Sequence, residues 1–211
     1  MSISVLGVIV ARGGSSLARK NLLPLCGKPL LYWTCECAKK AMRLDKVIIS
    51  TDDKDIAAYA QSCGIEVPFE RPNNLATDTA PTVEVIRHAL RYFPSYDAVF
   101  TLQPTDPLRI PDDIDGAIEL LEKHDESSAI IGYSDSHHYP ARLVNITSNR
   151  IIPILRDFPQ FTRRQELAPV FIRNGAVYLS GVQTVDDGSI QGRNPRPFFI
   201  PKSRCWSIDD E

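Results

Sequence analysis

The 211-residue sequence predicts a single α/β domain, residues 1–211, built on a mostly parallel sheet flanked by helices. Short apolar segments of strand length alternate with segments of helical periodicity over residues 4–133. The first of them, Ser4–Val10, is apolar almost throughout, as is typical of a central strand buried on both faces. The hydrophobic fraction is 43% and the charged fraction is 24%, which are average values for a globular chain with a sizeable core.

The predicted elements follow in regular order after the first strand. Helices are expected at Pro29–Met42, at about 53–63, at Thr82–Tyr92 and at Pro111–Lys123. Further strands are expected at Lys46–Ser50, Ile65–Phe69, Asp97–Leu102 and Ser128–Tyr133. Pro29 suits a first helical turn, Thr51 or Asp52 can cap the second helix, and Gly64 can end it.

The alternation breaks after Tyr133, and we interpret residues 134–169 as an excursion from the sheet. Val144–Thr147 and Arg150–Leu155 predict a short hairpin inside it. Two further strands are then expected, at Phe171–Ser180 and Phe198–Pro201. Gly175 lies inside the first of these, where a glycine permits close approach of another group.

The segments that follow the strands carry the polar chemistry. In a parallel sheet the carboxyl ends of the strands meet at one edge, and ligands bind there. We therefore expect one site to be formed by residues 11–21, 51–52, 71–80 and 103–109.

Composition excludes several classes of protein. The formal net charge of −2 argues against a nucleic-acid partner. No apolar run approaches the roughly 18 residues of a membrane span, and no signal peptide is apparent before Ser4–Val10. The five cysteines lack metal-binding spacing, so we expect free buried thiols in a cytoplasmic protein.

The first loop, residues 11–21, has the composition of an anion site. Gly13 and Gly14 let backbone N–H groups turn toward an anion, and Arg12, Arg19 and Lys20 can surround a polyphosphate. The loop is neither a Walker A motif nor a dinucleotide fingerprint. The alternative is a solvated turn with unrelated basic residues.

Several motifs in order resemble the N-acylneuraminate cytidylyltransferase family, whose members activate sialic acids and related nonulosonic acids. The opening stretch ARGGSSLARKNLLPLCGKPLL carries the resemblance, as do LQPTDPLR and RRQELAPVFIRNGAVYL. Residues 1–133 and 163–181 match well, and the region between them is looser. The resemblance implies a Rossmann-like sheet of the nucleotide-diphospho-sugar transferase type.

The resemblance also implies a reaction. A nonulosonic acid attacks the α-phosphate of CTP, pyrophosphate leaves, and a CMP-sugar results. Such a displacement needs alignment and charge neutralisation more than covalent help from the protein. The cofactor implied is Mg²⁺, the partners are CTP and the acid sugar, and the excursion implies a homodimer.

Site residues follow from the matching motifs. Nucleotide contacts are implied for Ala11, Arg12, Gly13, Gly14, Ser15, Lys20, Asn21 and Arg71, with Arg12, Lys20 and Gln103 as catalytic residues. Ser16 stands where the family has a phosphate-binding lysine, and Arg19 is one candidate to replace that charge.

Sugar contacts are implied for Gln103, Thr105, Arg163, Arg164, Gln165, Asn174, Tyr178 and Phe198. An arginine of the 163–164 pair suits the sugar carboxylate, and the alternative is a solvated basic turn. Taken alone, Tyr178 and Phe198 would be interpreted as core residues. Asp106, in place of the family's usual serine, either approaches a ligand or serves as a turn residue.

The C-terminal Ser207-Ile208-Asp209-Asp210 resembles the family's Asp-Ile-Asp metal motif, with Asp209 as the implied Mg²⁺ ligand and Asp210 as an alternative. Two rival functions remain open. One is a nucleotidyltransferase for a different sugar, such as a sugar 1-phosphate. The other is a non-catalytic nucleotide-binding homologue, suggested by Ser16 and by Ser207.

Overall fold

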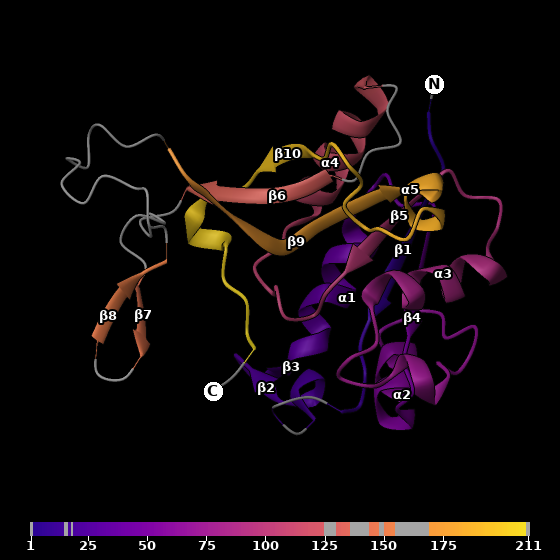
Figure 1. Cartoon of the computed structure of the whole chain (residues 1–211). Helices are drawn as coiled ribbons and strands as arrows, with labels where there is room; N and C mark the ends of the chain where they lie inside the picture. The colour runs from indigo at the N-terminus through magenta and orange to yellow at the C-terminus, as the bar shows by residue number, and fades with distance from the viewer. Residues whose placement is uncertain are drawn as a thin grey trace.

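The structure, a computed structural model, is built on a six-stranded sheet with strand order β10-β6-β9-β5-β1-β4 (Figure 1). It describes residues 2–14, 17, 19–124, 130–135, 144–147, 150–154 and 169–209. The six strands are β1 (Val5–Val10), β4 (Lys46–Ser50), β5 (Ala98–Leu102), β6 (Ile130–Asp135), β9 (Phe171–Gly181) and β10 (Arg196–Phe199). The predicted α/β class is confirmed.

One strand runs against the others. β9 pairs antiparallel with both β5 and β6, whereas β1 pairs parallel with β4 and β5, and β10 pairs parallel with β6. The beginning of β9 therefore reaches the edge of the sheet where β5 ends. The β6–β9 register shifts between Ile131 and Tyr133, which marks a β-bulge at this place. Bulges of this kind redirect side chains at the rims of sheets.

Helices cover both faces of the sheet. The core on one face contains residues of α1 (Leu30–Lys40), α2 (Lys54–Ser62) and α4 (Pro111–Lys123). The core on the other face contains residues of α3 (Thr82–Tyr92) and α5 (Val182–Asp186). Alternate residues of β1 divide between the two cores, because successive side chains of a strand point to opposite faces. This is a three-layer arrangement.

Elements with a clear sequence pattern have the predicted bounds. α3, α4 and β4 begin and end as expected. α1 is shorter than expected, with Pro29 immediately before it. The expected cap of α2 was wrong: Asp53 caps the helix, its carboxylate accepting from the backbone N–H of Asp55 at 2.8 Å and of Ile56 at 3.0 Å. Gly64 follows with φ +79°, so its role as the stop signal is confirmed.

The predicted strand at Ile65–Phe69 was wrong. Only an isolated bridge joins Glu66 to Ile48 there, and Pro68 has no N–H to extend it. The Phe69 ring instead stacks on Tyr92 of α3, with the centroids 4.6 Å apart. The last strand begins and ends two residues earlier than expected, as β10.

Several short elements had no clear sequence signal. They are α5, the small hairpin of β2 (Pro24–Leu25) and β3 (Lys28–Pro29), and the 3-10 helices η1 (Lys20–Leu22), η2 (Asn73–Leu75) and η5 (Lys202–Arg204). Each spans five residues or fewer, which is too short for periodicity to reveal.

The predicted hairpin within 134–169 is confirmed as β7 (Val144–Thr147) and β8 (Arg150–Pro153), with Ile146 opposite Ile151. It forms its own two-stranded sheet and lies apart from the main sheet in Figure 1. Most of the remaining excursion lies outside the described residues.

None of the five cysteines, all of which the structure describes, forms a disulfide. Cys35 and Cys37 are buried, but Cys26 is exposed on the β2–β3 turn, so the expectation of burial was wrong for that thiol. Within the described ranges, no helix combines the length and apolar character needed to cross a membrane.

Candidate active site

A cavity of about 280 Å³ lies at the edge of the sheet where the parallel strands end. Three of the four predicted segments contribute to its lining, and the C-terminal segment also reaches it. The lining includes these predicted site residues: Arg12, Lys20, Asn21, Arg71, Gln103, Thr105 and Asp209. Among these predicted residues, the structure thus brings three cationic side chains, two neutral amides and one carboxylate into one cavity.

The loop after β1 places Arg12 and Asn21 together. Asn21 is buried, and its side-chain amide donates a hydrogen bond of 3.0 Å to the backbone carbonyl of Arg12. This bond fixes the backbone of Arg12 at the wall of the cavity. The Arg12 guanidinium lies 2.5 Å from a carboxylate oxygen of Asp78, which comes from the loop after η2.

Lys20 joins the beginning of the chain to its C-terminal segment. Its side chain is only 11% exposed, and its Nζ lies 3.4 Å from Oδ1 of Asp209. The backbone N–H of Ile208 donates to the carbonyl of Thr105 at 2.8 Å, so the C-terminal segment is anchored on the loop after β5. Figure 1 shows this segment descending from η5 toward β2 and β3.

Arg71 is a buried cation in the cavity wall. Its Nε donates to Oγ of Ser50 at 3.0 Å, and its backbone N–H donates to the carbonyl of Thr51 at 2.8 Å. Burial lowers the pKa of Arg71 to about 10, opposed by the nearby charge of Asp52. The guanidinium therefore stays protonated at neutral pH, held against the end of β4.

Arg109 lies in the predicted segment 103–109, and its structural role has no counterpart in the sequence-based expectations. It is buried, its Nε donates to the carbonyl of Ala176 at 2.6 Å, and its Nη2 donates to the carbonyl of Gln103 at 2.9 Å. These bonds tie the end of β5 to the bulge of β9 and so position Gln103. An arginine in a proline-rich turn gives no sequence signal that it turns inward.

Asp106 lies beneath the same loop, with an exposed fraction of 2%. Its Oδ2 accepts from the Thr105 hydroxyl at 3.1 Å, and its buried Oδ1 has no hydrogen-bond partner among the described residues. Burial raises the pKa of Asp106, and the charge of Asp209 raises it further. Asp106 is therefore more than a solvated turn residue.

We expect Asp106→Asn to change how stability depends on pH. The folded chain binds the Asp106 proton more tightly than the unfolded chain, so this carboxyl costs stability as pH rises above its ordinary value of 3.8. The difference in melting temperature, variant minus unsubstituted chain, should therefore increase as the pH is raised from acidic to neutral. Each kcal/mol of unfolding free energy corresponds to about 2–4 °C. Thermal melts from pH 4 to 7 test this, and a constant difference would contradict it.

Other predicted nucleotide contacts lie beside the cavity rather than in its wall. Ala11 is buried in the core, and its N–H donates to the carbonyl of Ser50. The N–H of Gly13 donates to Asp52 at 3.0 Å, so this donor is turned to the chain's own carboxylate. Gly14 borders open space, because a Cβ added to it would have no atom within 4 Å.

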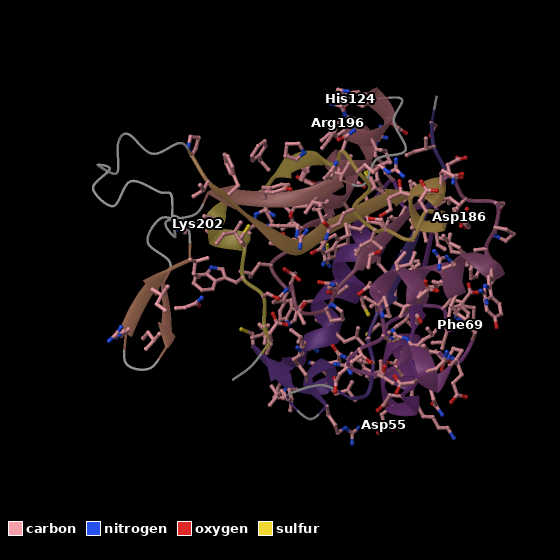
Figure 2. The ribbon with its side chains drawn as sticks, viewed as in Figure 1. Asp55, Phe69, His124, Asp186, Arg196 and Lys202 are labelled. Carbon is pink, nitrogen blue, oxygen red and sulfur yellow. The ribbon has the colours of Figure 1, made fainter. Side chains whose placement is uncertain are left out.

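The suggestion that Arg19 supplies the charge missing at Ser16 was wrong. The Arg19 guanidinium is 58% exposed and pairs with Asp55 at 2.5 Å. Figure 2 shows Asp55, in the first turn of α2, at the lower limit of the view. Arg19 does not line the cavity.

Three predicted sugar contacts on the later strands also lie outside the cavity lining. The Asn174 amide donates to Sγ of Cys205 at 2.9 Å, and its oxygen accepts from the N–H of Ala176 at 2.9 Å. The Phe198 ring packs on Gly116 of α4, so the core interpretation holds for this ring. Tyr178 is half-buried in β9, where burial raises the pKa of its hydroxyl.

Ser15, Ser16, Arg163, Arg164, Gln165 and Asp210 lie outside the described residues. The side chains of Asn174 and Phe198 each have partners within the chain.

A mostly parallel sheet with a cation-lined cavity at its carboxyl edge is typical of an α/β protein of the nucleotide-binding type. The comparisons with known proteins agree. The family model described as "Cytidylyltransferase" matches residues 6–178, and the chain belongs to this family.

The relatives support the same family. The chain is 29% identical to an N-acylneuraminate cytidylyltransferase of Escherichia coli, covering 100% of this chain and 50% of that protein. It is 30% identical to the CMP-N,N'-diacetyllegionaminic acid synthase of Legionella pneumophila, covering 97% and 90%. The chain thus spans about half the length of the first relative and most of the second.

A solved structure shares the fold. It is a CMP:2-keto-3-deoxy-manno-octonic acid synthetase complexed with CTP, with a TM-score of 0.73 and 18% identity, covering 98% of this chain and 93% of that one. At this identity the likeness concerns the fold alone.

Proposed function

We propose that this chain transfers the cytidylyl group of CTP to a nonulosonic acid. The observation that carries the proposal is that Arg12, Lys20, Arg71 and Gln103 all line the same cavity. The relatives named above support the choice of nucleotide and sugar class, because their names specify N-acylneuraminate and diacetyllegionaminic acid.

The cavity suits the charge of the reaction. The anomeric oxygen of the sugar attacks the α-phosphorus, and the bond from that phosphorus to the oxygen bridging the β-phosphate breaks. Pyrophosphate leaves, and the hydroxyl proton passes to water. Arg12 offers phosphate oxygens a fork of donors, and Lys20 offers a point charge. Both would stabilise the negative charge that develops on the leaving pyrophosphate.

The acceptor would lie beside Gln103 and Thr105, whose side chains donate and accept hydrogen bonds with sugar hydroxyls. Arg163, Arg164 and Gln165 are proposed for the sugar carboxylate and its neighbours on the strength of the motif. Asn174, Tyr178 and Phe198 would take part only from behind the cavity wall.

Mg²⁺ is the proposed cofactor. Among the described residues, no three His, Cys, Asp or Glu side chains gather to hold a metal alone. Mg²⁺ is commonly bound by one or two carboxylates together with substrate phosphates, and Asp209 in the cavity wall supplies one. Bound there, the ion would neutralise phosphate charge.

A homodimer is proposed from exposed apolar side chains of the β7–β8 hairpin and the residue after it, and of strands β9 and β10. They are Ile146, Ile152, Ile154, Phe171, Ile172 and Phe199. Exposed patches of this kind mark interaction surfaces. Light scattering should give the mass of two chains, and Phe199→Asp should shift it toward one. A monomeric mass for the unsubstituted chain would contradict this.

Pyrophosphate release tests the proposed function. The chain is incubated with CTP, Mg²⁺ and a panel of nonulosonic acids, with 3-deoxy-octulosonic acid and sugar 1-phosphates as comparison acceptors. Release with a nonulosonic acid supports the proposal. Release only with a sugar 1-phosphate supports the first rival, and CTP binding without any release supports a non-catalytic homologue.

A further inference from the structure

Arg12 is paired with a carboxylate inside the nucleotide cavity. Nη2 of Arg12 lies 2.5 Å from Oδ1 of Asp78, and both residues line the cavity. Asp78 belongs to the loop between η2 and α3, whose Thr77 and Ala80 line the same cavity. The ion pair therefore joins the loops after β1 and η2 across the space where a nucleotide would bind.

The two partners differ in burial. The Arg12 side chain is 29% exposed, whereas the Asp78 side chain is 81% exposed. Ion pairs with so exposed a partner are weak, because water screens the charges and the mobile side chain loses entropy on pairing. Asp78 can therefore leave Arg12 at small cost, while Arg12 stays near the cavity wall through its backbone bond to Asn21.

We propose that Asp78 competes with the phosphates of the bound nucleotide for Arg12, and so sets the affinity of the cavity for polyphosphate. This inference rests on the proposed function, in which Arg12 grips the triphosphate. A carboxylate and a phosphate oxygen use the same donors of a guanidinium. Each incoming phosphate must therefore displace Asp78, and each departing one leaves Arg12 with a ready partner.

The competition predicts in which direction, and by how much, loss of the Asp78 charge changes the affinity for CTP. Asp78→Asn keeps the shape of the side chain and removes its charge, so Arg12 is left available. Exposed ion pairs are worth about two- to fivefold in an equilibrium constant, and loss of repulsion between Asp78 and the phosphates adds to this. We expect CTP to bind about three- to tenfold more tightly to the variant.

Calorimetric titration of the full chain tests the proposal, without acceptor acid so that no turnover occurs. CTP should bind more tightly to Asp78→Asn, while cytidine, which has no phosphate, should bind as it does to the unsubstituted chain. Asp55→Asn is the matched control, because it removes the carboxylate of the exposed Arg19–Asp55 pair away from the cavity. This control should leave CTP affinity unchanged.

A double-mutant cycle with Arg12→Ala separates the inference from the function on which it rests. Asp78→Asn should have a clearly smaller effect once Arg12 is absent, because only the loss of repulsion between Asp78 and the phosphates then remains. If Arg12→Ala does not weaken CTP binding, the proposed grip of Arg12 on phosphate is wrong. If Arg12→Ala weakens binding but Asp78→Asn alone leaves it unchanged or weaker, the competition is overturned, and weaker binding would indicate that Asp78 contacts the nucleotide directly.

Discussion

Gly175→Ala should reduce transfer activity by about a hundredfold, the scale of loss that a misplacement of about 1 Å produces. A Cβ on Gly175 would come within 3.0 Å of Oε1 of Gln103 and Oδ2 of Asp106, closer than real Cβ atoms approach. The Asp106 carboxylate is buried and has little room to move, whereas the Gln103 side chain can shift into the cavity that it lines. The added methyl group must therefore displace Gln103 from its place in the cavity.

Steady-state kinetics with varied acceptor acid measure this effect, with kcat and KM determined separately. Ser180→Ala is the control, because it removes a hydrogen bond to the Ile190 carbonyl from the far end of β9. It should lower the melting temperature while leaving the activity of the folded enzyme intact. Normal kcat and KM in folded Gly175→Ala would show that Gln103 does not need its present position.

Lys20→Ala should lower kcat/KM for CTP by about two to three orders of magnitude, the loss seen when one donor to a transition-state charge is removed. The Lys20 side chain is largely buried at the cavity wall, so its charge is less screened than a surface charge. The same substitution releases Asp209 from its ion pair and so loosens the C-terminal segment.

Pyrophosphate release at several CTP concentrations measures the loss. Arg19→Ala, one residue earlier, removes a cation whose side chain is exposed and paired with Asp55, and it should retain nearly full activity. Equal losses in the two variants would mean that the general basicity of this loop matters and the position of Lys20 does not.

The parts of the molecule with strong local patterns could be predicted from the sequence. α3 and α4 each have an apolar stripe at helical spacing, and their bounds are as expected. The cavity was also predictable in outline, because parallel strands bring their following loops to one edge whatever the details of those loops. Arg12, Lys20 and Gln103 meet there for that reason.

What escaped prediction depends on contacts between distant residues. At the irregular part of β9, Gly175 lies close to Asp106 and Gln103, and Asn174 bonds to Cys205, all of them distant in the sequence. The inward direction of Arg109 depends on carbonyls of β9 that lie far away in the sequence. Local propensity contains no information about such partners.

The anchoring of Ile208 on Thr105 has a practical consequence for protein engineering. A fluorescent label or affinity tag joined shortly after Asp209 would begin at the mouth of the cavity and could obstruct it. Residues 2–4 instead lead into β1 at the amino ends of the parallel strands, which is the edge of the sheet opposite the cavity. Attachments belong at that end when ligand access has to be preserved.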